Sequence, residues 1–273
     1  MKIALAQMCS GLDWRANAEQ LRSSMSEAAS NGAEILFTPE MTGILDRDRS
    51  RLAKAIAVEE DDPFLAEARE LSRQYGIWLQ LGSLAVKTQA DPNQKWANRS
   101  FLIDPDGNIV ARYDKIHLFD IDLGSELSMR ESAAYTGGKQ AVVAPFENKL
   151  IGLSICYDLR FAGLFEAQTN AGAQLLSVPA AFTVPTGKAH WETLLRARAI
   201  ESGVFVVAAA QCGTHEDGRA TWGHSMIIGP WGAVRAHIDG DTPGIICADI
   251  NLTDVAEARR KIPAWQHDPE YSL

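Results

Sequence analysis

The 273-residue sequence has few cysteines, no excess of basic charge and no long hydrophobic run, and each absence argues against a class of protein. Its four cysteines are widely spaced without a C-x-x-C pair, which argues against a zinc clip or a redox dithiol. The net charge of −9 argues against a nucleic-acid partner, which would require a basic surface. No stretch reaches the roughly 18 apolar residues of a membrane-spanning helix, and the apolar run 3–8 is too short for a signal peptide. We therefore expect a cytoplasmic protein with reduced thiols.

Short apolar runs alternate along the chain with segments of helical periodicity, a pattern typical of α/β proteins. Strands are expected at residues 2–8, 34–37, 77–86, 98–103, 109–113, 141–146, 150–155, 174–178, 204–210, 225–228, 233–238 and 245–250. Helices are expected at residues 18–28, 64–75, 161–171, 190–201 and 255–260. Each half of the chain includes a hairpin, so the sheets should be mixed. We expect a single domain over residues 1–273, with two packed sheets and the helices outside.

Three of the expected strands end beside a residue that could take part in catalysis, namely Glu40, Lys115 and Cys156. Because ligands of α/β sheets bind beyond the carboxyl ends of the strands, the three side chains could converge. A thiol attacks as a thiolate, so Glu40 could take the proton of Cys156 while a buried Lys115 stabilises an oxyanion. Burial would neutralise this lysine unless a carboxylate, Glu40 or Glu131, keeps it charged.

The residues alone leave other interpretations open. Cys156 could be a packing residue at a strand end, and the charged residues could be solvated. A Cys–His pair of the papain type is also conceivable, with His117, His190 or His224 as the base. Spacing alone does not decide between these interpretations.

Three segments resemble the signature motifs of the nitrilase superfamily, whose members are carbon–nitrogen hydrolases with a Glu-Lys-Cys triad. They are Phe-Thr-Pro-Glu at 37–40, Tyr-Asp-Lys-Ile-His-Leu at 113–118 and Ile-Cys-Tyr-Asp-Leu-Arg-Phe at 155–161. The motifs occur in the family's order, and the resemblance runs along the whole chain. It implies an α/β fold built as a four-layer α-β-β-α sandwich, paired into a homodimer or a dimer of dimers.

The resemblance also implies a role for each motif residue. Cys156 would attack the carbonyl carbon of an amide, and Lys115 with the backbone N–H of Tyr157 would form the oxyanion hole. Glu40 would serve as general base and acid, and Glu131 would orient the substrate or support Lys115. Water would then hydrolyse the thioester. No metal and no organic cofactor would be needed, and the partner would be a small-molecule amide rather than nucleic acid or a membrane.

Five further segments, residues 179–183, 186–192, 195–201, 208–213 and 222–226, resemble the Nit branch of this family. The branch includes amidases that act on deaminated glutathione and omega-amidases that act on α-ketoglutaramate. The segment 210–215 is more similar to the former, which implies α-ketoglutarate and cysteinylglycine as products. The alternatives are an omega-amidase, a nitrilase, and a non-catalytic binding protein, which is disfavoured because every triad position is filled. The connection 119–131 varies among related enzymes, so it predicts no specificity.

A substrate of this kind carries a keto-acid carboxylate, which a cation should bind. Arg160 is the candidate, since a guanidinium can hold a carboxylate through two hydrogen bonds, although it could instead pair with Asp158. Phe182 and Thr186 lie in branch segments and could line the pocket, or they could be structural, Thr186 as a helix N-cap. Gly163 stands where members of the branch commonly have glutamate, which puts the helix packing beside the pocket in doubt.

Overall fold

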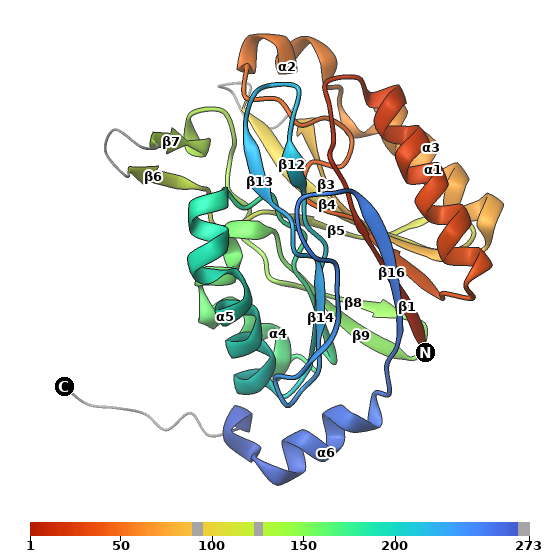
Figure 1. Ribbon diagram of the computed structural model, residues 1–273, viewed down its shortest axis with the longest axis vertical. Coiled ribbons are helices and arrows are strands. Elements are labelled where there is room, and N and C mark those ends of the chain that lie inside the picture. The colour runs from red at the N-terminus through yellow and green to blue at the C-terminus, as the bar shows by residue number, and fades with distance from the viewer. Residues whose placement is uncertain (89–94, 123–127, 267–273) are drawn as a thin grey trace.

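Two six-stranded β-sheets form the centre of the computed structural model, which describes residues 1–88, 95–122 and 128–266 (Figure 1). The strands of the first sheet, in spatial order, are β16 (Gly244–Asp249), β1 (Lys2–Gln7), β2 (Ile35–Phe37), β3 (Trp78–Lys87), β4 (Trp96–Ile103) and β5 (Ile109–Asp114). Those of the second are β15 (Val234–His237), β14 (Met226–Ile228), β11 (Phe205–Ala208), β10 (Leu175–Ser177), β9 (Lys149–Leu153) and β8 (Val142–Phe146). Two short hairpins lie outside these sheets, β6 (Asp120–Asp122) with β7 (Ser128–Arg130) and β12 (Cys212–Thr214) with β13 (Ala220–Trp222).

Both sheets are mixed, as the sequence predicts. In the first sheet, β1, β2 and β3 run parallel, whereas β16 pairs antiparallel with β1 and β4 antiparallel with β3. In the second, β9, β10 and β11 run parallel between the antiparallel strands β8 and β14. The two predicted hairpins are β4–β5 and β14–β15. Residues 123–127, within the 119–131 connection, lie outside the described part of the chain.

Helices cover the outer face of each sheet, which gives the expected α-β-β-α sandwich (Figure 1). The covering helices are α1 (Trp14–Ser30) and α3 (Pro63–Tyr75) on the first sheet, and α4 (Ala162–Asn170) and α5 (Val184–Ser202) on the second. The remaining helices are α2 (Arg49–Ala55), α6 (Thr253–Lys261) and the short 3₁₀ turns η1 (Glu59–Asp61), η2 (Glu131–Ala133), η3 (Cys156–Arg160) and η4 (Pro263–Gln266). Among the described residues, no helix is long and apolar enough to cross a membrane.

The alternation of side chains along β1 shows how the layers are held together. Ile3 and Leu5 join the core that includes the strands of the second sheet, whereas Ala4 and Ala6 join the core that includes α1 and α3. Successive side chains of a strand point to opposite faces, so one strand contributes to two layers of packing. Burial of a side chain the size of leucine or isoleucine contributes about 1.5–3 kcal/mol.

The clearest difference from the expected elements is at α5, which begins at Val184 rather than at His190. Pro185 lies in its first turn, where proline needs no hydrogen-bond donor, and Thr183 occupies the N-cap position. His190 is therefore inside the helix, and the N-cap role considered for Thr186 is wrong. The first turn of α5 lines a cavity instead of the core, which explains why apolar periodicity did not reveal it.

Candidate active site

The three predicted triad residues come together at the wall of one cavity of about 600 Å³. Glu40 follows β2, Lys115 directly follows β5, and Cys156 begins η3 shortly after β9. Glu131, the first residue of η2, lines the same cavity. The ends of strands from both sheets therefore meet at one place, as the sequence predicts.

Lys115 lies between two carboxylates. Its Nζ is 2.9 Å from Glu40 Oε1 and 2.9 Å from Glu131 Oε2, and 2% of its side chain is exposed. Burial opposes its charge, but the carboxylates of Glu131 and Glu40 outweigh this effect and raise the pKa of Lys115 well above its usual value. An ammonium group has three N–H donors, so one remains for a substrate oxygen after two have been directed to the glutamates.

Glu40 is a buried carboxylate with a partner at each oxygen. Asn98 Nδ2 donates to Oε1 at 2.8 Å, and the backbone N–H of Ala181 donates to Oε2 at 3.0 Å. Burial alone would raise its pKa, but the charge of Lys115 and hydrogen bonds from Cys156, Lys115 and Asn98 hold the pKa of Glu40 below its usual value. Glu40 is therefore ionised at neutral pH, the form that accepts a proton.

The thiol of Cys156 lies beside the carboxylate of Glu40, and the backbone of Cys156 is in a strained conformation. Its φ of 52° is in the left-handed region, which costs a non-glycine residue about 1–3 kcal/mol. The backbone N–H donates to the carbonyl of Pro179 at 2.9 Å, which fixes this conformation. Burial and then the charge of Glu40 raise the pKa of the Cys156 thiol, with Lys115 opposing them. The proton therefore rests on sulfur, beside the carboxylate that can take it.

Asp158 connects the segment that carries the lysine to the segment that carries the thiol. Its Oδ2 accepts hydrogen bonds from the hydroxyl of Tyr113 at 2.7 Å and from the N–H of Ile155 at 2.9 Å. Its Oδ1 accepts from the N–H of His117 at 3.0 Å and lies 2.7 Å from His117 Nδ1. The pairing of Asp158 with Arg160, considered from the sequence, is wrong because Asp158 is occupied by these partners.

The three predicted substrate-binding residues all line the cavity. Arg160 forms no ion pair within the described residues, and its guanidinium lies over the rings of Tyr157 and Phe182, 5.8 and 5.6 Å from their centroids. It is also 3.4 Å from His190 Nδ1. The hydroxyl of Thr186 is 2.8 Å from that of the N-cap threonine of α5. Arg160 therefore lies in the cavity as a cation without an acidic partner.

Among the described charged residues that line the cavity, basic ones outnumber acidic ones, although the whole chain carries a net charge of −9. Among the residues that the structure describes, six basic side chains line it against three acidic ones. The basic residues are Arg47, Arg49, Lys115, Arg130, Arg160 and Arg219. A cleft with an excess of one sign of charge attracts ligands of the opposite sign. The cavity is thus suited to an anionic ligand.

The alternative Cys–His pair is not formed. Among the described residues, the three candidate histidines have other partners: His117 with Asp158, His190 with Arg160, and His224 with His237. The structure also shows how Gly163 affects the helix packing. Gly163 is exposed on α4, and a Cβ there would meet no atom within 4 Å, so the glycine leaves no gap in the packing.

Sequence reasoning missed Asn98, which contacts both carboxylates of the site. Its Nδ2 donates to Glu40 Oε1 at 2.8 Å and to Glu131 Oε1 at 3.2 Å. Asn98 is a buried polar residue within β4, and buried polar groups in a strand need partners. A polar side chain within an expected buried strand was therefore the one signal that could have indicated Asn98. The sequence does not show which residues face that strand.

Comparison with known proteins identifies the family of this chain. A family model described as carbon-nitrogen hydrolase matches residues 2–260. The chain belongs to the carbon–nitrogen hydrolase family. This confirms the predicted family and the predicted reaction class, the hydrolysis of a carbon–nitrogen bond.

Individual relatives agree with this result. The chain is 40% identical over 267 residues to the deaminated glutathione amidase of Yersinia enterocolitica, a match that covers 97% of this chain and 92% of that protein. The crystal structure of the Caenorhabditis elegans NitFhit protein superposes with a TM-score of 0.89 at 38% identity, and the match covers 98% of this chain and 64% of that one.

A third relative is an amidase from Nesterenkonia sp. AN1. One of its mutants superposes with a TM-score of 0.78 at 28% identity, over 96% of this chain and 98% of that one. That structure shows the result of Michael addition of acrylamide at its active site cysteine. These structural matches confirm the predicted sandwich fold.

Proposed function

We propose that this protein is an amidase that hydrolyses deaminated glutathione to α-ketoglutarate and cysteinylglycine, with Cys156 as the nucleophile. The observation that carries the proposal is the arrangement of Cys156 beside Glu40, which pairs with Lys115, at the wall of a cavity with an excess of basic residues. Relatives named deaminated glutathione amidase, 37–40% identical to this chain over nearly its whole length, support the choice of substrate.

In the first step, Glu40 takes the proton of the Cys156 thiol as the sulfur attacks the amide carbonyl carbon. The carbonyl oxygen becomes negative and accepts hydrogen bonds from Lys115 and from the N–H of Tyr157. Tyr157 is the second residue of η3, a position whose N–H has no partner within the helix. Because both donors are fixed before the reaction, each stabilises the transition state; removal of one such donor typically costs about 2.7–4 kcal/mol. Glu131 keeps Lys115 charged and in place.

In the second step, the tetrahedral adduct collapses and the carbon–nitrogen bond breaks. Glu40 gives its proton to the leaving nitrogen, cysteinylglycine departs, and an α-ketoglutaryl thioester remains on Cys156. Water then attacks the thioester carbonyl while Glu40 accepts a proton from the water. The second tetrahedral adduct releases α-ketoglutarate, and the proton on Glu40 returns to the sulfur. The cycle needs no redox partner, and its protons balance.

The basic cavity supports a substrate with two carboxylates. Deaminated glutathione carries one at its α-keto acid end and one on its glycine. Arg160, on the same 3₁₀ turn as Cys156, is suited to the first, and the exposed Arg47 and Arg130 at the solvent side are suited to the second. The cavity of about 600 Å³ lies within the range of sites that enclose a ligand of this size, roughly 300–1,000 Å³.

A second candidate is an omega-amidase reaction on α-ketoglutaramate. One observation favours it, namely that Arg160 lines the cavity without an acidic partner among the described residues. This smaller substrate has one carboxylate and would leave the arginines at the solvent side without a role. A nitrilase has no observation of its own in its favour. A binding protein would not require a thiol beside a buried carboxylate and a buried ammonium group.

The experiment compares kcat/KM for deaminated glutathione and α-ketoglutaramate in the wild type and two variants. Arg160→Ala should raise KM for both substrates, and Arg47→Ala only for deaminated glutathione, each by about 10–100-fold if a charged hydrogen bond worth roughly 1.5–3 kcal/mol is lost. Arg235→Ala, which breaks an exposed ion pair with Asp254, is the control. A preference for α-ketoglutaramate that Arg47→Ala leaves unchanged would contradict the proposed substrate.

We also propose that the protein works in the cytoplasm as a homodimer or a dimer of dimers. All four cysteines are free thiols, which suits a reducing compartment. Ile200 on α5 and Trp231 and Val234 on the β14–β15 hairpin expose 55%, 59% and 41% of their surfaces, an apolar area that a second copy could cover. Light scattering of the purified protein would give the oligomeric mass. The single domain over residues 1–273 remains a prediction.

A further inference from the structure

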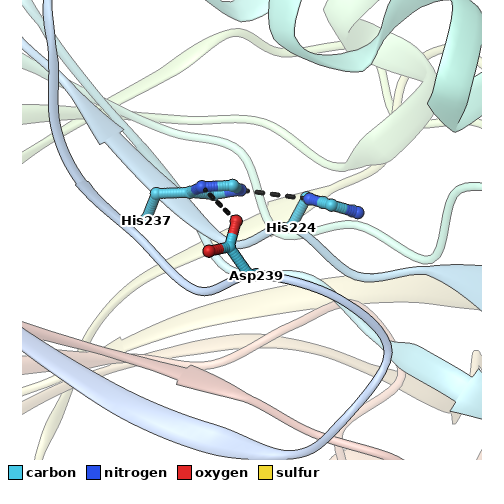
Figure 2. Close-up of side chains that lie close together, drawn as sticks. All are labelled: His224, His237 and Asp239. Atoms are coloured by element: carbon cyan, nitrogen blue, oxygen red, sulfur yellow. Dashed lines mark hydrogen bonds and ion pairs between the residues drawn. The ribbon is translucent and has the colours of Figure 1, made fainter.

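A cluster of two histidines and one aspartate lies apart from the cavity that holds Cys156. His224 Nδ1 and His237 Nε2 are 3.1 Å apart, and His237 Nδ1 is 3.1 Å from Asp239 Oδ1 (Figure 2). One potential ligand atom from each of the three residues lies within 4.8 Å of the other two. None of the three residues lines the cavity. The cluster therefore has no part in the amidase mechanism described above.

The backbone fixes the position of His224. Its φ of 58° is in the left-handed region, and its carbonyl accepts a hydrogen bond from Trp191 Nε1 at 2.8 Å. Its ring stacks on that of Trp222, with the centroids 4.3 Å apart. At Gly223 a Cβ would lie 2.5 Å from the carbonyl oxygen of Gly240, so glycine allows the two segments to approach. These contacts hold the backbone of His224 in its strained left-handed conformation.

The geometry of the two rings suits one metal ion. Zinc binds imidazole nitrogen at about 2.0–2.1 Å, so two nitrogens on a tetrahedral ion stand about 3.3 Å apart, close to the observed separation. Metal-bound histidines commonly direct their other nitrogen to a carboxylate, as His237 does to Asp239.

We propose that His224 Nδ1 and His237 Nε2 bind a divalent transition-metal ion of the Zn²⁺ type, with Asp239 holding the His237 ring through Nδ1 and water completing the coordination. His224 precedes β14, His237 ends β15, and Asp239 begins the turn that leads to β16. Gln7 Nε2 of β1 donates to the carbonyls of Gly240 and Thr242 in this turn, at 3.2 and 3.0 Å. The ion would therefore connect the second sheet to a turn that is anchored on the first.

A bound ion of this kind should stabilise the fold without entering the reaction. A ligand that binds only the native state stabilises it by RT ln(1 + [L]/Kd), so the melting temperature should rise with metal concentration. Because the site is separate from Cys156, the effect should be present in protein that lacks the catalytic thiol.

The test is calorimetric titration of full-length Cys156→Ala protein with Zn²⁺ after chelator treatment, together with melting temperature. The nucleophile's thiol is removed so that it cannot bind the metal. We expect one equivalent of zinc and a higher melting temperature. Both should be lost in His237→Ala and in His224→Gly, which tolerates the left-handed backbone. Asp239→Asn should weaken binding by about 10–100-fold.

His190→Ala is the matched control, because it removes a histidine whose ring faces Arg160 rather than this cluster, and it should bind zinc normally. Circular dichroism would verify that each variant is folded. The absence of a zinc equivalent would overturn the proposal, since the two rings would then only share a hydrogen bond. An equivalent that persists in folded His237→Ala and His224→Gly would also overturn it, because the metal would be bound elsewhere.

Discussion

Lys115 has the least solvent exposure of the three charged residues at the site. Burying these charges carries a desolvation penalty. Two carboxylates share one ammonium group in a nearly dry environment, with 2%, 7% and 11% of the lysine, Glu40 and Glu131 side chains exposed. Desolvation of such charges is expensive, and partners must compensate for it. This cost is consistent with the proposed role of the cluster in the reaction rather than a role in stability, and removal of one partner leaves the others uncompensated.

Substitution Lys115→Met should destabilise the fold and abolish the reaction. Breaking a buried ion pair by removing one partner typically costs about 3–5 kcal/mol, and here two carboxylates lose their cation. Urea unfolding measures the free energy, and steady-state kinetics measure kcat. The control is Lys261→Met, which breaks an exposed pair with Glu257 and should leave both unchanged. A Lys115→Met protein with wild-type kcat would contradict the assigned role.

The pH dependence of activity should follow Glu40 and not the thiol. Because the pKa of Glu40 is below its ordinary 4.5, kcat/KM should stay level through neutrality and fall only in acid below that value. The raised pKa of Cys156 means that no rise should occur through the ordinary thiol value of 9.0. A profile of kcat/KM against pH gives the result, and a clear increase near pH 9.0 would indicate a free thiolate instead of a proton transfer to Glu40.

The stability of the fold should change at both extremes of pH. The contribution of Glu40, whose pKa is lowered on folding, is present above pH 4.5 and is lost as pH falls through the folded value. The contribution of Lys115, whose pKa is raised, is present below pH 10.5 and is lost as pH rises through the folded value.

At the residue scale, the sequence predicts that Glu40, Lys115 and Cys156 lie close together, but it does not predict the residues that hold them in place. A thiol, an ammonium and a carboxylate at strand ends are chemically conspicuous, and the family motifs confirm their order. Asn98 and Asp158 form hydrogen bonds with residues that are 33–58 positions away in the sequence. A local sequence pattern cannot predict such partners. Their partners become visible only when the two sheets are assembled.

At the scale of elements, an irregularity in β3 positions the loop that carries Glu40. The register of β3 against β4 shifts in a segment that includes Gly82 and Ser83. The N–H of Gly82 donates to Thr38 Oγ1 at 2.9 Å, and Ser83 Oγ accepts from the N–H of Met41 at 2.9 Å. Strand irregularities of this kind often re-aim a neighbouring segment beside an active site.

Substitution Gly82→Ala should displace this loop. A Cβ at Gly82 would lie 2.1 Å from the carbonyl oxygen of Thr38 and 2.2 Å from that of Pro39, so the backbone would have to move. Overpacking of this kind costs about 1–3 kcal/mol, and kcat should fall because Glu40 moves with the loop. Gly163→Ala is the control, since its Cβ meets open space, and should keep wild-type kcat and melting temperature. Equal kcat in the two variants would show that the loop does not depend on Gly82.

Element boundaries were predictable where helical or strand periodicity continued to the end. Gly76 closes α3 in the left-handed conformation that suits a helix C-cap, directly after the helix predicted over residues 64–75. The start of α5 and the irregularity in β3 were not predictable in the same way. In both places the side chains face the cavity or a supporting loop, so the usual core pattern is interrupted.

At the scale of the whole molecule, the site exists only where the two sheets meet. Glu40 and Lys115 come from the first sheet and Cys156 from the second. Asp158 is the buried connection between them, because it accepts hydrogen bonds from residues after or within β5 and from Ile155 after β9. The two-sheet architecture was predictable from the repeated order of elements in the two halves of the chain. The alignment of the sheets depends on contacts such as these.

Substitution Asp158→Asn should therefore loosen the two sheets at the site. An amide keeps the shape but replaces one acceptor oxygen with a donor beside Tyr113, His117 and Ile155. An unsatisfied buried group costs about 1–3 kcal/mol, and kcat should fall with little change in KM because the thiol and the lysine lose their relative placement. Urea unfolding and initial rates give both quantities. Asp249→Asn, at the exposed end of β16, is the control and should leave both quantities unchanged. Unaltered stability and kcat in the Asp158→Asn variant would contradict the role of Asp158 in connecting the two sheets.

The most direct test of the account is to trap the acyl-enzyme during turnover of deaminated glutathione. Rapid acid quenching followed by peptide mass spectrometry should find an α-ketoglutaryl group on the peptide that contains Cys156, at a level that rises and falls with turnover. The Cys156→Ala protein should show neither the adduct nor the products. Turnover of deaminated glutathione without an adduct on Cys156, or with full activity in Cys156→Ala, would contradict the central claim that this thiol is the nucleophile.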